Sequence, residues 1–174
     1  MCLRHGVLQV QSGDPAGAMP PLEEALAIAE ARDRLVEKPV PLVPHALARI
    51  ELGDLAGAAP ELAAGLSISG TLGLNVVQLL ALPGACRLLA LRGEEGDDEA
   101  AVRLLGAALA ASRREGIPLD DYRETRLAAT QDAVAARLGP EAWERERSAG
   151  DWMTAGDAAD AAFAALQAGL TQPQ

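Results

Sequence analysis

Aromatic side chains are scarce in this 174-residue sequence. Only Tyr122, Trp143, Trp152 and Phe163 occur. Hydrophobic residues nevertheless make up 49% of the chain, so the interior must be built from Ala, Leu and Val. Because these side chains are small, the elements that carry them must pack at short distances.

Basic side chains are also in the minority. There are 15 Lys and Arg against 25 Asp and Glu, which gives a net charge of −10. Nucleic-acid binding requires clustered Lys and Arg, so this balance argues against a direct nucleic-acid partner. An acidic surface mainly favours solubility. The length fits one continuous domain with a core of its own.

Cysteine is limited to Cys2 and Cys86, too few for a disulfide framework. The first ten residues lack the apolar core and the cleavage site of a signal peptide. The longest apolar stretch, residues 72–93, is too polar and too broken to span a membrane. Its interruptions are Asn75, Gln78, Pro83 and Arg87. We therefore expect a cytoplasmic protein.

One short pattern occurs three times. It reads GDPAGAMPPLEEAL at 13–26, GDLAGAAPELAAGL at 53–66 and GDDEAAVRLLGAAL at 96–109. Counted from the first Gly, each copy has Ala five positions on and Leu nine and thirteen positions on. Steps of four keep to one helical face, so each copy is predicted to be a helix with an inward Ala-Leu-Leu stripe. The stripes are Ala18, Leu22 and Leu26; Ala58, Leu62 and Leu66; and Ala101, Leu105 and Leu109.

The segments ahead of these helices match at a spacing of 40 residues, from Gly13 to Gly53. A small residue precedes each glycine by seven positions, and the third copy has three extra residues at 94–96 in this register. The aligned small residues are Gly6, Ala46 and Cys86. Each unit is therefore predicted to be two closely packed antiparallel helices joined by a Gly-Asp turn, with the Asp at or near the N-cap. Such pairs must stack to bury their apolar faces, so about three units are needed.

Two prolines, Pro20 and Pro60, fall inside the predicted helices, where proline costs about 3 kcal/mol. Both lie seven residues after the repeat glycine, where the third copy has Arg103. We predict a first turn loosened by Gly17 or Gly57 that bends or restarts at the proline. The lost N–H bond should face the exposed side.

The last third of the chain is predicted to form capping helices. Gly116 should stop the third repeat helix at about residue 115, and Gly139 and Pro140 mark the next helix boundary. Thr154 and Asp157 resemble a capping box. The expected division is 1–117 for the repeats, 118–168 for the capping helices and 169–174 for a flexible tail. Three of the aromatics are expected to pack within the cap, namely Trp143, Trp152 and Phe163.

The Gly-Asp turn, the residues at intervals of four and the small residue seven positions earlier resemble the tetratricopeptide repeat. The period of 40 is longer than the usual 34, and Leu, His and Ala fill the customary aromatic positions. Longer repeats of this kind are similar to those in large ATP-binding bacterial transcription regulators, the LuxR-type and MalT-like group, and related multidomain ATPases. Residues 100–166 resemble the end of that repeat region segment by segment. The resemblance implies an all-α, right-handed α-solenoid of antiparallel helix pairs.

The ATPase and DNA-binding modules of those regulators have no counterpart in the sequence. The glycines that open the repeat helices precede Asp, which would repel phosphate. We therefore expect a fragment of a larger regulator or signalling ATPase. Its partner would be a protein or the regulator's other domains. The N-terminal edge would be an unfinished repeat whose exposed apolar face permits self-association.

Catalytic, cofactor and metal sites are not expected. Cys2, His5, His45 and Cys86 add up to a Cys2His2 set, but repeat stacking would hold them about 8–10 Å apart per layer, whereas zinc ligands converge to about 2 Å. The serines lack a nucleophile-elbow context; they are Ser67, Ser69, Ser112 and Ser148. The acid pairs are expected to be solvated surface; they are Glu23-Glu24, Glu94-Glu95, Asp97-Asp98 and Asp120-Asp121.

Two functions remain open. The first is a non-catalytic scaffold whose first helices expose an apolar groove suited to an amphipathic helix. Its lining would be Leu3, Val7, Val10, Val43, Leu47 and Ile50. The alternative is that these residues simply pack between layers. The second is an inducer-sensing domain. Its polar pocket would hold Arg49, Asn75, Gln78 and Arg87.

Overall fold

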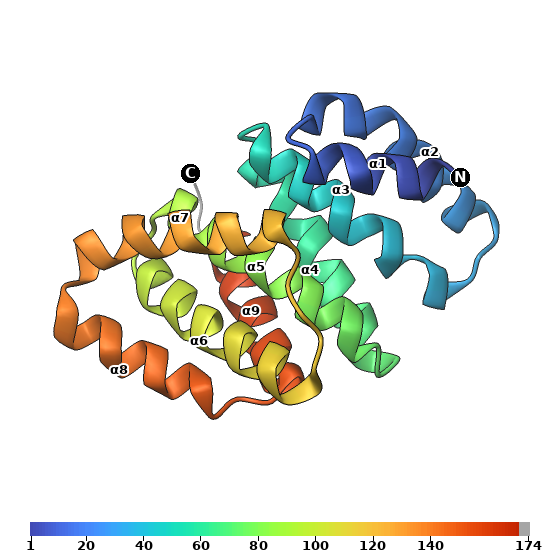
Figure 1. Cartoon of the computed structure of the whole chain (residues 1–174). Helices are drawn as coiled ribbons and strands as arrows, with labels where there is room; N and C mark the ends of the chain where they lie inside the picture. The colour runs from blue at the N-terminus through green and yellow to red at the C-terminus, as the bar shows by residue number, and fades with distance from the viewer. Residues whose placement is uncertain (171–174) are drawn as a thin grey trace.

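The computed structural model describes residues 1–170, which form helices joined by short connections (Figure 1). The helices are α1 (Cys2–Gln11), α2 (Pro15–Ala31), the 3-10 helix η1 (Leu35–Glu37), α3 (Pro39–Glu51), α4 (Leu55–Thr71), α5 (Asn75–Arg92), α6 (Asp97–Glu115), α7 (Asp121–Leu138), α8 (Pro140–Asp151) and α9 (Ala155–Leu170). The all-α prediction is confirmed for this part of the chain. Of the tail predicted at 169–174, residues 169–170 belong to α9, and the rest lies outside the described residues. None of the described helices is long and apolar enough to cross a membrane.

The first two Gly-Asp turns have the predicted chemistry. Gly13 and Gly53 both adopt φ of +83°, a left-handed conformation that favours glycine. The Asp14 carboxylate accepts from the backbone N–H of the residue three positions on at 2.9 Å, and Asp54 does the same. Each Asp is therefore the N-cap of the helix that follows.

The third turn is built differently. Its N-cap is Gly96, and Asp97 is the first residue of α6. Asp97 is only 4% exposed. Its carboxylate accepts from Arg92 at 2.7 and 2.8 Å and from the Glu94 N–H at 3.0 Å. With the extra residues at 94–96, this carboxylate does not cap its helix as Asp14 and Asp54 do. It binds Arg92 instead and so connects α5 to α6.

The predicted stripes lie inside the molecule. Their first two members are fully buried in all three copies. The third member is buried at Leu66 but half-buried at Leu26 and Leu109. The close approach predicted at Gly6 is also present, because a Cβ there would lie 2.5 Å from Leu22 Cγ. Ala46 and Cys86 are completely buried at the matching positions.

Helices α2 and α4 continue through their internal prolines. Pro20 and Pro60 are both exposed, so the missing N–H bond faces outward as predicted. No restart occurs, and a bend of the axis stays a prediction. Gly17 has another role, since a Cβ there would overlap the Asp14 carboxylate. This glycine makes room for the N-cap.

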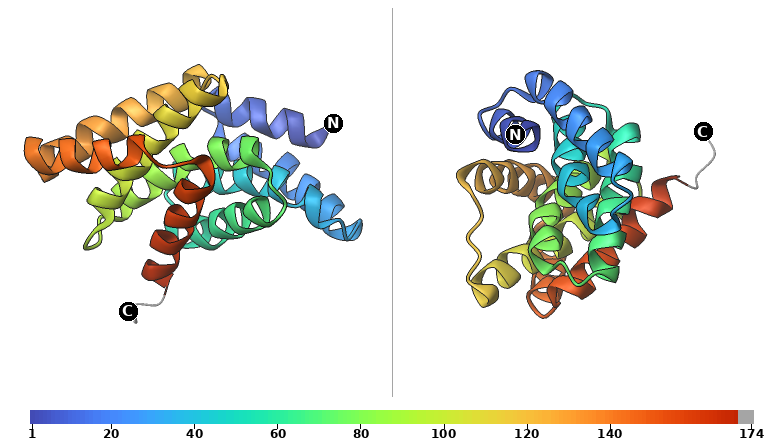
Figure 2. Two further views of the ribbon diagram at one scale, coloured as in Figure 1. Left: turned by 90° about the horizontal axis from the view of Figure 1, so that it is seen from below. Right: turned by 90° about the vertical axis from the view of Figure 1, so that its right-hand side faces the viewer.

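The first six helices pack in consecutive pairs, and each new pair begins on the one before. The last three helices do not simply extend this row. Helix α8 packs most extensively on α6, whereas α9 folds back over α4, α5 and α6. Figure 2 shows α9 (red) against the middle of the molecule. The last three helices therefore cover the side of this row of six helices as well as its end.

The aromatic prediction is only partly right. Trp143 and Phe163 pack half-buried against the core. Trp152 is 87% exposed, so its predicted packing role is wrong. It occupies the C-cap of α8, where the chain turns toward α9 and leaves the indole outside.

Candidate functional site

The residues predicted to line an apolar groove do not form an open one. Val10, Val43, Leu47 and Ile50 are buried, and Leu3 and Val7 are half-buried. Leu47 lies against Gly84 of α5, where even an added methyl group would overlap it. The burial favours the alternative, in which these residues pack between helices.

The four residues of the predicted polar pocket are not brought together. Arg49 pairs with Asp54 at 2.6 Å and with Glu61 at 3.2 Å. Gln78 is buried and Asn75 is exposed, both in the first turn of α5. Arg87 lies on the same helix nine residues beyond Gln78, about 13 Å along the axis. It pairs with Glu51 at 2.7 Å.

The cysteines and histidines are distributed over three helices. His5 is exposed on α1, whereas His45 is buried on α3 with Nδ1 2.7 Å from Glu61 Oε2. Burial raises the pKa of Cys86 to about 12, which keeps this thiol protonated and unreactive. Within residues 1–170, no three His, Cys, Asp or Glu are grouped so that they could hold a metal ion.

Some acid pairs expected on the solvated surface have structural roles. Arg137 binds the Asp98 carboxylate at 2.6 and 2.7 Å. Asp120 accepts from Arg123 and from Gln11, and it also caps α7. Asp97, Asp98 and Asp120 lie at helix starts, as expected, but they are bound by arginines and are not solvated surface carboxylates. Among the serines, the Ser112 hydroxyl donates to the Ile117 carbonyl at 2.7 Å.

A polar cluster centres on Glu51, at the end of α3. Its carboxylate, with a side chain only 8% exposed, pairs with Arg87 at 2.7 Å and with Arg126 at 3.1 Å. The Arg126 guanidinium also lies 5.3 Å from the centre of the Tyr122 ring, a cation–π contact. Burial, with the nearby Glu51 charge, raises the pKa of Tyr122 to about 12. Tyr122 therefore remains a neutral hydrogen-bonding phenol at physiological pH.

An open hollow of about 350 Å³ adjoins this cluster. The α1–α2 turn forms one wall and the first turns of α7 form the other. Gln11 Nε2 donates to Asp120 Oδ2 at 2.9 Å and joins the two walls across 109 residues. Sequence reasoning missed this site, although Tyr122 and Arg126 have the i,i+4 spacing that places them on one helix face.

A second, apolar hollow of about 390 Å³ lies at the N-terminal edge, between α1, α2, η1 and α3. Its apolar lining includes Leu3, Ala25, Ile28, Ala29, Val36 and Val40. Ile28, Val36 and Val40 are 38%, 49% and 42% exposed. On the rim, Glu37 binds Arg32 and Arg34 at 3.2 and 3.1 Å, and these hydrogen bonds lower its pKa.

Proline shapes this hollow. When the 40-residue spacing is applied, η1 aligns with residues 75–77, which form the first turn of α5. Pro39 is N1 of α3 and has no N–H to extend the helix backward. The chain before it turns outward as η1 and walls the hollow.

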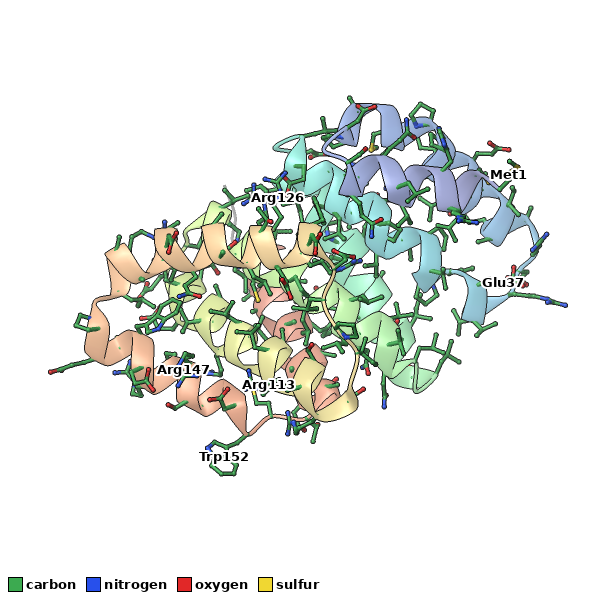
Figure 3. The ribbon with its side chains drawn as sticks, viewed as in Figure 1. Met1, Glu37, Arg113, Arg126, Arg147 and Trp152 are labelled. Carbon is green, nitrogen blue, oxygen red and sulfur yellow. The ribbon has the colours of Figure 1, made fainter. Side chains whose placement is uncertain are left out.

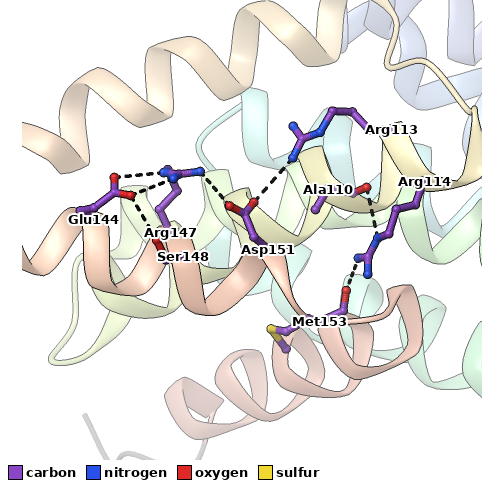
Figure 4. A network of polar contacts seen from close by, with 8 residues as sticks. All are labelled: Ala110, Arg113, Arg114, Glu144, Arg147, Ser148, Asp151 and Met153. Atoms are coloured by element: carbon purple, nitrogen blue, oxygen red, sulfur yellow. Dashed lines mark hydrogen bonds and ion pairs between the residues drawn. The ribbon is translucent and has the colours of Figure 1, made fainter.

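The opposite region of the molecule is tied by arginines (Figure 4). Arg147 pairs with Glu144 at 2.8 Å and with Asp151 at 3.0 Å. Arg113 lies 3.6 Å from Asp151. The Arg114 guanidinium donates to the carbonyl oxygens of Ala110 and Met153. These contacts hold the α8–α9 connection, from which Trp152 projects (Figure 3).

No protein-family model matches this chain, and neither a curated protein nor a solved structure matches it. The helix pairing and the two hollows are therefore the observations from which a function can be inferred.

Proposed function

We propose that this chain is a non-catalytic, tetratricopeptide-like helical-repeat module that binds a protein segment. Three helix pairs support the repeat assignment, because they share stripe spacing and pack consecutively. The proposed architecture is a right-handed α-solenoid closed by α7, α8 and α9. We place it in a larger cytoplasmic transcription regulator or signalling ATPase, on the resemblance of residues 100–166.

The apolar hollow at the N-terminal edge carries the binding proposal. It presents Ile28, Val36 and Val40 to solvent in a chain whose net charge is −10. Concave apolar surface of this kind is typical of docking sites. The apolar face of an amphipathic helix fits such a hollow, with charged residues on its rim.

A second candidate is the sensing of a small polar molecule. The hollow beside Tyr122 favours it, because a phenol, the Arg126 guanidinium and the Asp121 carboxylate border one concave space. Such a mixture of donors and acceptors can orient a polar ligand.

Matched Val→Asp variants test the binding proposal. Val36 in the hollow and Val76 at the start of α5 are 49% and 50% exposed. We expect Val36→Asp to abolish binding of an apolar fluorescent dye and capture of a protein partner, and Val76→Asp to retain both. Equal behaviour of the two variants would contradict the proposal. A thermal-shift screen of metabolites against wild type and Arg126→Ala tests the second candidate: a shift that Arg126→Ala removes would support sensing.

A further inference from the structure

Among the side chains that the structure describes, Trp152 is the most exposed large hydrophobic one after the terminal Met1. It follows the last turn of α8 and projects from the ribbon (Figure 3). Its connection is held on both sides, because Asp151 pairs with Arg147 and the Met153 carbonyl accepts from Arg114. A large apolar side chain on a fixed support is a typical interface anchor, since little flexibility is lost on binding.

The apolar hollow is a receptor of suitable size for this anchor. Its volume of about 390 Å³ has room for one indole, and its lining is mainly apolar, with Arg32 and Glu37 as its charged members. Burying an aromatic side chain removes about 150–250 Å² of surface from water. Met1 and Glu37, which line the hollow, lie in a different part of the molecule from Trp152 (Figure 3). The anchor of one molecule therefore cannot fill its own hollow.

The rim of the hollow carries charges of both signs. Arg32 and Arg34 are both paired with Glu37, whereas Glu30 and Asp33, exposed beside the hollow residues Ala29 and Arg32, are in none of the ion pairs found within residues 1–170. Beside Trp152, Arg114 contacts only carbonyl oxygens, and Arg113 has a single carboxylate at 3.6 Å. Two copies of a chain with net charge −10 repel each other in general. This contact would bring the Glu30 and Asp33 carboxylates to the guanidinium groups of Arg113 and Arg114.

We propose that the occupant of the hollow is a second copy of this chain, which inserts Trp152. The inference rests on the proposed function, because it names the partner of the same hollow. Two different surfaces meet, so the contact is heterologous and either closes a ring or continues head to tail. The Arg113 and Arg114 side chains of one copy would then lie beside Glu30 and Asp33 of the other.

Complementation tests this contact. Sedimentation velocity over a range of protein concentrations should show self-association of wild type and Val76→Asp. Trp152→Ala and Val36→Asp should each weaken it at least tenfold. An equimolar mixture of these two variants should form a 1:1 complex, because one retains the hollow and the other retains the tryptophan. Unchanged far-ultraviolet circular dichroism would show that the variants fold, with Ile28→Asp as a second hollow variant.

The contrary results are distinct. A wild type that stays monomeric, or a mixture that does not associate, overturns the inference. If the apolar dye still binds wild type but not Val36→Asp, the hollow serves another partner and the proposed function stands. If Val36→Asp leaves both association and dye binding unchanged, the inference and the proposed function fail together.

Discussion

The two ends of the molecule differ in how their helices meet. In the first helix pair, Gly6 of α1 lies against a side chain, Leu22 of α2. In the last part, Gly106 of α6 lies against the backbone of Arg147 in α8, and Gly150 of α8 lies against the backbone of Arg103 in α6. Arginine pairs add to this second contact, because Arg103 binds Glu146 across the same two helices. The apolar hollow lies at the N-terminal edge, and the connection that carries Trp152 lies at the C-terminal end of α8.

The largest expected effect tests whether the N-terminal helices are held mainly by apolar packing. Leu47→Asp places a charge at a position 7% exposed, against Gly84. We expect a loss of about 4 kcal/mol or more in the free energy of unfolding, because side-chain packing is lost and a charge is buried. Urea unfolding followed by circular dichroism measures this. A variant that stays stably folded and loses only partner binding would support the exposed apolar groove predicted from the sequence.

The glycine crossing of α6 and α8 should be nearly as sensitive. In Gly150→Ala the added Cβ would overlap the Arg103 carbonyl oxygen, and backbone cannot move aside as a side chain can. We expect about 3 kcal/mol of destabilisation. Gly156→Ala is the matched control, since the nearest atom to its Cβ would be Thr154 Oγ1 at 3.8 Å. Equal thermal stability of the two variants would mean that this backbone contact is not close.

Asp14 and Asp97 occupy equivalent positions in the first and third copies of the sequence pattern, but their replacement by Ala should lower the free energy of unfolding by different amounts. Asp97→Ala leaves the largely buried Arg92 without its main partner, for which we expect about 3 kcal/mol. Asp14→Ala removes only an exposed N-cap bond, for which we expect about 1 kcal/mol. Chemical denaturation of both variants gives the comparison. Equal losses would contradict the separate role assigned to the third turn.

The smallest effect concerns acid. Burial favours a raised pKa at Glu146, but the hydrogen bonds from Arg103 and Arg145 outweigh it and lower the pKa below the ordinary 4.5. A lowered folded pKa contributes stability that is complete above about pH 4.5 and is lost as pH falls through the folded value. We expect Glu146→Gln to cost about 1 kcal/mol at pH 7 and to flatten the stability curve below pH 4.5. If the free energy of unfolding of the variant falls with pH below 4.5 as steeply as that of wild type, Glu146 does not contribute to this pH dependence.

Short-range features of this fold could be predicted from the sequence. The stripes that contain Leu22 and Leu62 and the first two Gly-Asp turns depend on spacing and local hydrogen bonds, so they appear where the pattern places them. The site could not be predicted in the same way. The Glu51–Arg87 pair spans 36 residues, and the Gln11–Asp120 bond spans 109.

Which side chains are exposed to solvent could not be predicted from the sequence either. Nothing local distinguishes Trp152 from Trp143, yet one is exposed and the other packs against the core. The hollow also depends on tertiary structure, because η1 and the ends of α1, α2 and α3 must meet to form it. Its local cause, the proline that starts α3, was visible in the sequence, but its consequence was not.

Hydrogen exchange at increasing protein concentration tests the central claim most directly, namely that the hollow and the Trp152 support fit each other. Mass spectrometry would follow peptides covering residues 25–41 and 148–154, with the buried helix α5 as internal reference. We predict that both peptides gain protection together while α5 does not change. Identical exchange of both peptides at every concentration would contradict the account.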